Sequence, residues 1–152
     1  MTNWLGNQTF IAYAITVLVL CANLLLLWVY SGFARGGTKQ AINEEDALKY
    51  GAQLTDTDPA PVARVLRAHD NASANIYPFL FLGLVYVMAG GTPRLGTALF
   101  AIFTIARLLH SLAYLLRLQP WRTVFFLVGL VATVVLMVGV VLQLLNAPCS
   151  SC

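Results

Sequence analysis

Three polar side chains interrupt one long apolar stretch at a spacing that places them on a single helix face. Arg107, His110 and Tyr114 stand at positions i, i+3 and i+7, so a helix would present them together. A buried arginine needs a partner, and all six acidic residues lie between Glu44 and Asp70. Arg107 therefore pairs with Asp70, bonds to backbone carbonyls, or helps to hold an anionic ligand. The structural alternative is a buried polar contact between helices.

A second polar stripe precedes the second apolar stretch. Arg64, Arg67, Asn71 and Ala74 are separated by three, four and three residues, which also places them on one helix face. The two arginines have a simple alternative role, because long basic side chains at a helix end extend to the membrane interface. Asn71 has no such explanation, and we interpret it as a candidate contact to a polar ligand.

The last apolar stretch is preceded by Gln119, Pro120, Trp121, Arg122 and Thr123. Proline is favoured in the first helical turn, and tryptophan is favoured at a membrane interface. Arg122 beside the positive end of a helix can hold an anion or favour a thiolate over a thiol. The alternative is that Arg122 only anchors the helix at the interface.

The elements that must position these residues are membrane-spanning helices. Hydrophobic residues make up 59% of the 152 residues and charged residues only 10%, against about 25% charged residues in soluble domains. The apolar runs have the roughly 20 residues that a span requires, provided that the second helix begins upstream near Pro61. We therefore predict an all-α, integral membrane four-helix bundle in a single domain. Its helices are expected at about 9–35, 61–89, 94–117 and 121–146.

The basic residues predict the orientation of these helices. Five of them lie in or beside the connection between the first and second spans, and Arg117 and Arg122 flank the connection between the third and fourth. The positive-inside rule places both connections in the cytoplasm. Both termini are then outside the cytoplasm, in a bacterial inner membrane or an endoplasmic-reticulum-type membrane. The predicted partner is the lipid bilayer, and the scattered basic residues do not form a nucleic-acid footprint.

The remaining polar features are a loop helix and a terminal cysteine pair. Asn43 followed by Glu44, Glu45 and Asp46 indicates an N-cap with carboxylates in the first turn of a short helix. Cys149 and Cys152 form C-x-x-C, which allows either a disulfide in an oxidising compartment or two free thiols. We expect no metal site, because no third or fourth ligand stands nearby.

Four ordered motifs resemble the MAPEG family, the membrane-associated proteins in eicosanoid and glutathione metabolism. The motifs are 43–48 (NEEDAL), 62–71 (VARVLRAHDN), 75–83 (NIYPFLFLG) and 107–114 (RLLHSLAY). The likeness extends over roughly residues 10–145 and is closest to the microsomal glutathione transferase and prostaglandin E synthase branch.

The resemblance implies a homotrimer of four-helix subunits with a glutathione site between subunits near the cytoplasmic side. It implies that Arg122 stabilises the thiolate and that Thr123 supplies a hydroxyl in place of a serine. An apolar small-molecule substrate would enter from the bilayer. Candidate residues for holding glutathione as a co-substrate are Arg35, Arg67, Asn71, Arg107, His110 and Tyr114.

Two positions depart from the family pattern. Asp70 stands where the branch has a basic or neutral residue, and Ala74 stands where it has a glutamate that recognises the charged end of the peptide. The hypothesis that follows from the resemblance is a glutathione transferase or peroxidase acting on lipophilic electrophiles or lipid hydroperoxides. The alternative is a non-catalytic lipid-binding or scaffold protein. A channel or transporter is a third class, without a half-helix or filter motif to favour it.

Overall fold

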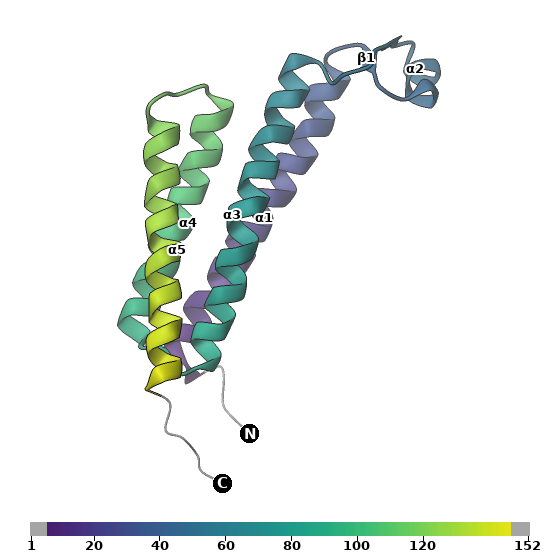
Figure 1. The fold of residues 1–152 in the computed structure, drawn as a ribbon. Helices are drawn as coiled ribbons and strands as arrows, with labels where there is room; N and C mark the ends of the chain where they lie inside the picture. The colour runs from purple at the N-terminus through teal and green to yellow at the C-terminus, as the bar shows by residue number, and fades with distance from the viewer. Residues whose placement is uncertain (1–5, 147–152) are drawn as a thin grey trace.

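The computed structural model describes residues 6–146 and contains four long helices that run antiparallel (Figure 1). Each of the four is long and apolar enough to cross a membrane, which confirms the expected bundle. Their ends lie within two residues of the expected positions. The helices are α1 (Gln8–Gly36), α3 (Ala60–Met88), α4 (Pro93–Leu115) and α5 (Trp121–Leu145).

The helix starts follow local chemistry. The side chain of Asn7 caps α1 by accepting hydrogen bonds from the backbone N–H groups of Thr9 and Phe10, at 2.9 and 3.2 Å. Proline lies in the first turn of both α3 and α4, where no intrahelical N–H donor is required. Pro120 directly precedes α5. These signals set where each span begins, and so where its polar residues lie relative to the membrane border.

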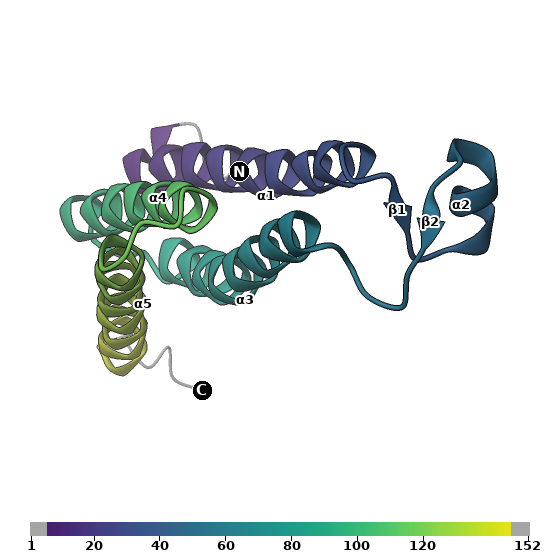
Figure 2. The ribbon, with the colours of Figure 1, turned by 90° about the horizontal axis from the view of Figure 1, so that it is seen from above.

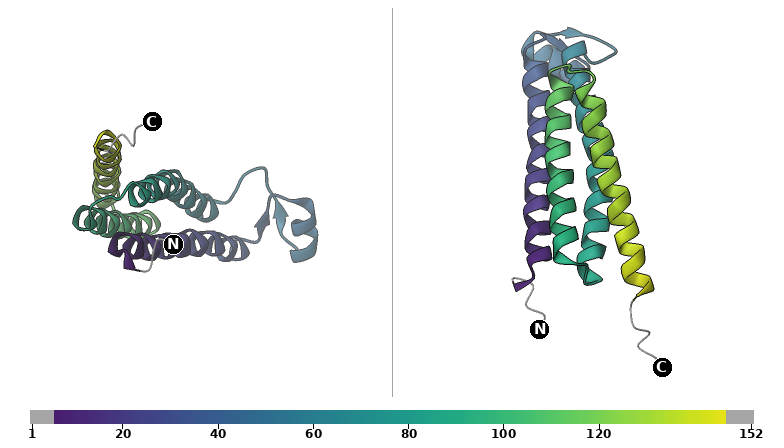
Figure 3. Two further views of the ribbon diagram at one scale, coloured as in Figure 1. Left: turned by 90° about the horizontal axis from the view of Figure 1, so that it is seen from below. Right: turned by 90° about the vertical axis from the view of Figure 1, so that its left-hand side faces the viewer.

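Helices α3 and α4 are central, because each of them packs against the other three spans. Helix α1 packs against α3 and α4, while α5 packs against α4 and α3 (Figures 2 and 3). The start of α1, the end of α5 and the α3–α4 turn share one end of the bundle. The α1–α3 connection and the α4–α5 turn share the other (Figure 3, right). The connections rich in basic residues therefore lie at the same end.

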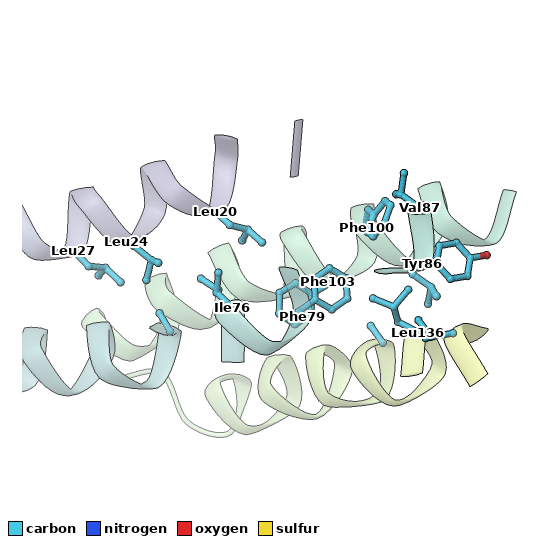
Figure 4. Close-up of a cluster of buried hydrophobic side chains, with 14 of the residues drawn as sticks. Leu20, Leu24, Leu27, Ile76, Phe79, Tyr86, Val87, Phe100, Phe103 and Leu136 are labelled. Atoms are coloured by element: carbon cyan, nitrogen blue, oxygen red, sulfur yellow. The ribbon is translucent and has the colours of Figure 1, made fainter. Parts of the chain in front are cut away.

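An aromatic cluster forms the middle of the core (Figure 4). The rings of Phe79 and Phe103 stack with centroids 3.6 Å apart, and Phe100 meets Phe79 edge-on at 6.0 Å. All three side chains are fully buried. Because lipid tails are as apolar as these side chains, close packing rather than water exclusion stabilises the contact.

A seam of polar contacts joins α1 to α4 and its preceding turn at intervals of seven residues. The side chain of Asn23 donates to Ser111 at 3.2 Å, and the hydroxyls of Thr16 and Thr104 lie 3.4 Å apart. Thr9 continues the series toward the α3–α4 turn. The seven-residue spacing of Thr9, Thr16 and Asn23 is visible in the sequence, but the sequence does not show which helix these residues contact.

The connection between α1 and α3 contains more structure than the expected short helix. That helix is present as α2 (Glu44–Tyr50), with Asn43 at its N-cap position and three carboxylates in its first turn. Two short strands flank it, β1 (Gln40–Ala41) and β2 (Gln53–Leu54), and they pair in parallel. The all-α prediction did not anticipate this pair, because two residues are too few for a strand pattern.

Candidate functional site

A pocket opens between α3, α4 and α5 at the end of the bundle that carries the basic connections. Its volume is about 260 Å³. Six residues line it: Asn71, His110, Tyr114, Arg122, Thr123 and Phe126. Five of these six are predicted site residues, although they come from three helices and are up to 52 positions apart in the sequence.

The wall contributed by α4 is aromatic. His110 is 3% exposed, and its ring lies 5.9 Å from that of Tyr114 and 6.4 Å from that of Phe126, between centroids. The tilted rings fix one another, because each fills the space beside the next. The predicted i, i+4 relation of His110 and Tyr114 thus becomes one side of the pocket.

Arg122 is held at the start of α5 by two neighbours. Its guanidinium carbon lies 4.8 Å from the centroid of the Tyr114 ring, a cation–π distance. When the amide oxygen of Gln119 faces the guanidinium, it accepts from Nε and Nη2 of Arg122 at 3.1 and 2.7 Å. The hydroxyl of Thr123 lies 3.3 Å from the other end of that amide. Gln119 therefore bridges the cation and the hydroxyl.

Asn71 supplies an unused acceptor. Its side-chain oxygen is buried and has no hydrogen-bond partner among residues 6–146. Buried polar atoms are almost always bonded, so this oxygen requires a donor from a ligand or a water molecule. The side-chain amide of Asn75 bonds instead to the backbone carbonyl of Asn71, at 2.7 Å.

The pocket lining defines the ligand chemistry that it can accept. Its described lining contains one permanent cation, two hydroxyls, an imidazole and an amide, and no carboxylate. The N-terminus of α5 adds partial positive charge beside Arg122. Such a lining favours a polar, anionic ligand with an N–H or O–H donor for Asn71, and it favours the ionised form of a thiol.

Arg107 lies inside the bundle and bonds to α5. Of the alternatives that the sequence left open, pairing with Asp70 is not found. Instead, Nη2 donates to the backbone carbonyls of Phe125 and Phe126 on α5, at 3.3 and 3.4 Å. Asp70 is 79% exposed at its side chain and lies elsewhere, with His69 at 3.8 Å. Arg107 therefore bonds to backbone carbonyls, which is the second of the three alternatives.

The guanidinium of Arg107 is packed between aromatic rings. Its central carbon lies 5.7 Å from the Phe103 centroid and 5.6 Å from the Phe126 centroid. A Cβ atom on Gly129 would lie 2.9 Å from its Nε, so the absence of a side chain there leaves room for it. Nε and Nη1 have no hydrogen-bond partner among the described residues. Arg107 does not line the pocket itself, but it packs against Phe126, which does.

The structure does not bring Arg35 or Arg67 into this pocket. Arg35 ends α1 and forms an ion pair with Asp58 at 2.7 Å. It lines a separate cavity of about 540 Å³ beside α2, together with Asp46 and Tyr50. Arg67 is exposed on the outer face of α3. Within one chain the eight predicted residues are therefore divided between a pocket, a buried cation and two peripheral arginines.

Two contributors were missed by the sequence analysis as site residues. Phe126 stands four residues after Arg122, and this spacing places both on one face of α5. Gln119 precedes the helix, so no periodicity identifies it; the signal was only its place in the turn before Arg122. The expected Cys149–Cys152 pair lies outside the described residues.

Comparison with known proteins gives matches over most of the chain. The MAPEG family model matches residues 13–142. Human prostaglandin E synthase is 40% identical over 120 residues, which cover 74% of this chain and 78% of that protein. The horse prostaglandin E synthase is 38% identical over 122 residues, covering 76% and 80%. Human microsomal glutathione S-transferase 1 is 34% identical over 135 residues, covering 85% and 86%.

Proposed function

Because the chain belongs to the MAPEG family, we propose that it is a membrane-bound glutathione transferase with peroxidase activity. Its substrates are lipophilic electrophiles and lipid hydroperoxides. The name of one relative, microsomal glutathione S-transferase 1, supports glutathione chemistry. The observation that carries the proposal is the pocket in which Arg122, Thr123, Tyr114, His110 and Asn71 converge.

In this proposal glutathione is a co-substrate held by the pocket. Its two carboxylates match a cationic lining, and its amide N–H groups can donate to the unpaired oxygen of Asn71. The thiol loses its proton beside Arg122 and the positive end of α5, because both favour the thiolate. The hydroxyl of Thr123, adjacent to Arg122 and bonded to Gln119, can donate a further hydrogen bond to the sulfur.

Two reactions follow from a thiolate in this position. With an electrophilic carbon, the sulfur forms a carbon–sulfur bond and the leaving group departs with the bonding pair. With a hydroperoxide, the sulfur attacks the terminal oxygen, the oxygen–oxygen bond breaks, and the alkoxide takes up a proton to become an alcohol. A second glutathione then reduces the sulfenic acid to water and glutathione disulfide. The apolar substrate reaches the thiolate from the bilayer.

The assembly proposed with this function is a homotrimer whose glutathione sites lie between subunits. Arg35 and Arg67, which stand apart from the pocket in one chain, then belong to the site through neighbouring subunits. Both termini are placed outside the cytoplasm, since the end of the bundle that carries the basic connections should face inward. The membrane is a bacterial inner membrane or an endoplasmic-reticulum-type membrane.

A second function is favoured by one specific observation. The described pocket lining has no carboxylate, and Ala74 stands where the family resemblance implies a glutamate for the charged end of the peptide. A chain that had lost glutathione chemistry would be a non-catalytic lipid-binding or scaffold protein. In that case the pocket would accept another anionic ligand.

The proposal is tested by the conjugation rate of Arg122→Ala with glutathione and a lipophilic aryl halide. A hydrogen bond to a charged group contributes about 1.5–3 kcal/mol, which corresponds to a loss of roughly 10- to 100-fold in rate. Arg117→Ala is the matched control, because Arg117 is an exposed arginine at the same end of the bundle and outside the pocket. Wild-type activity in Arg122→Ala would reduce Arg122 to an interfacial anchor.

A further inference from the structure

Helix α3 leaves one continuous stripe uncovered on its outer face. The exposed residues recur at intervals of three or four, which is the spacing of a single helix face. They are Arg67, Asp70, Ala74, Tyr77, Phe81, Leu84 and Met88. The stripe begins with two opposite charges and continues as an apolar surface to the end of the helix.

The two charges have no strong partner within the chain. Asp70 lies 3.8 Å from His69, which is 25% exposed and adjacent in sequence, and its own side chain is 79% exposed. Arg67 makes no hydrogen bond or ion pair with any residue in 6–146, and it does not bridge to Asp70, although the two are separated by three positions. The stripe therefore presents a free cation and a free anion one turn apart.

These charges are costly if the stripe faces lipid. Asp70 lies about 15 Å from the start of α3 at 1.5 Å per residue, on a helix that is 29 residues long. Ionisable groups within a span are normally covered and paired, so an uncovered and unpaired Asp70 at this depth is unfavourable. The apolar remainder of the stripe, in contrast, can be covered by either lipid or protein.

We infer that a second copy of this chain covers the stripe, and that Asp70 pairs with the partner's Arg67. The inference rests on the trimeric assembly proposed above and names the charges that hold it. An anion and a cation on one stripe are complementary to the same stripe of a rotated copy, so a closed ring satisfies every charge. The apolar residues that follow provide the packing surface along the rest of each helix.

The pairing also assigns a role to one departure from the family pattern. Asp70 is adjacent to Asn71 in the sequence but points out of the pocket that Asn71 lines. Its carboxylate therefore serves assembly, and it does not replace the missing glutamate at Ala74 as a contact for the ammonium of glutathione. The gain of Asp70 and the loss of the glutamate are separate changes.

Charge reversal tests the pairing. Arg67→Glu and Asp70→Arg would be purified in detergent separately and together, and the mass of the complex would be measured by light scattering without glutathione. Each single reversal should raise the concentration needed for assembly at least tenfold, and the double reversal should restore it. Arg94→Glu is the control, since Arg94 is exposed at the opposite end of the bundle.

Single reversals that assemble like the wild type would overturn the pairing and leave Arg67 only its role in the proposed glutathione site. A double reversal that assembles no better than the weaker single variant would overturn it equally, even if the single variants misfold. Thiolate absorbance with added glutathione is then recorded on the wild type alone, because Arg67 also belongs to the proposed glutathione site. If the single and double reversals change assembly as expected but the wild type gives no thiolate signal, the proposed function is contradicted and the pairing is still supported.

Discussion

Arg107 illustrates how a single charged residue is accommodated within a span. Sequence spacing predicted that it shares a face with His110 and lies inside the bundle, and it is 1% exposed. The same spacing could not identify its partners, because backbone carbonyls are present in every helix and carry no sequence signal. The choice of carbonyls on α5 over Asp70 is set by packing against Phe126 and by the open space at Gly129.

The fit between Arg107 and Gly129 is testable by a double-mutant cycle. Gly129→Ala should lower the free energy of unfolding by about 1–3 kcal/mol, because the new methyl group displaces the guanidinium. Arg107→Met should be close to neutral, since it also removes two unpartnered donors. The double variant should recover part of the loss, with a coupling of about 0.5–3 kcal/mol. Thermal or chemical unfolding in detergent measures each value, and strict additivity would show that the two residues do not interact.

Ala74 is the residue at which glutathione affinity should be improvable. Ala74 is exposed on the outer face of α3 and does not line the pocket of one chain. Ala74→Glu therefore adds a carboxylate to the glutathione site proposed between subunits, and it should tighten glutathione binding by roughly 10- to 100-fold, the equivalent of about 1.5–3 kcal/mol. Ala74→Gln is the matched control, because it adds the same bulk without charge. Dissociation constants from calorimetry give the comparison. Equal affinity in the glutamate and glutamine variants would mean that the ammonium of glutathione is bound elsewhere.

At the scale of elements, apolar length predicted the four spans and proline placed the start of three of them. The strands β1 and β2 and the seven-residue polar seam between α1 and α4 were not predicted. The strands are too short for periodicity to reveal. The seam could not be predicted without knowing that α1 and α4 are neighbours, since the role of Asn23 depends on its hydrogen bond to Ser111.

Helix packing near the α3–α4 turn depends on a socket for Tyr86. This ring is fully buried, and a Cβ on Gly96 would lie 3.0 Å from it and 2.8 Å from Thr9. Gly96→Ala should therefore lower the melting temperature in detergent, with a cost of about 1–3 kcal/mol from overpacking. Gly32→Ala on α1 is the control, because no atom lies within 4 Å of its added Cβ, and alanine is favoured over glycine in a helix by about 1 kcal/mol. If Gly96→Ala melts no lower than Gly32→Ala, the Tyr86 socket does not limit helix packing.

For the whole molecule, the sequence could group polar residues on helix faces but could not say which helix ends meet. The bundle places Asn71, His110 and Arg122 around one pocket, toward the end with the basic connections, where α3 diverges from the α4–α5 pair (Figure 1). Arg35 and Arg67 were grouped with them only through resemblance, and in one chain they lie apart. In the proposed trimer, a neighbouring subunit would supply Arg35 and Arg67 to the glutathione site.

The central claim is that this pocket binds glutathione and ionises its thiol. The most direct measurement is thiolate absorbance during a glutathione titration of the purified protein, with Arg122→Ala measured in parallel. The thiolate signal should saturate for the wild type and should be lost or reduced at least about tenfold in the variant. No saturable signal at millimolar glutathione in the wild type would contradict it, and would favour a protein whose pocket holds a different ligand.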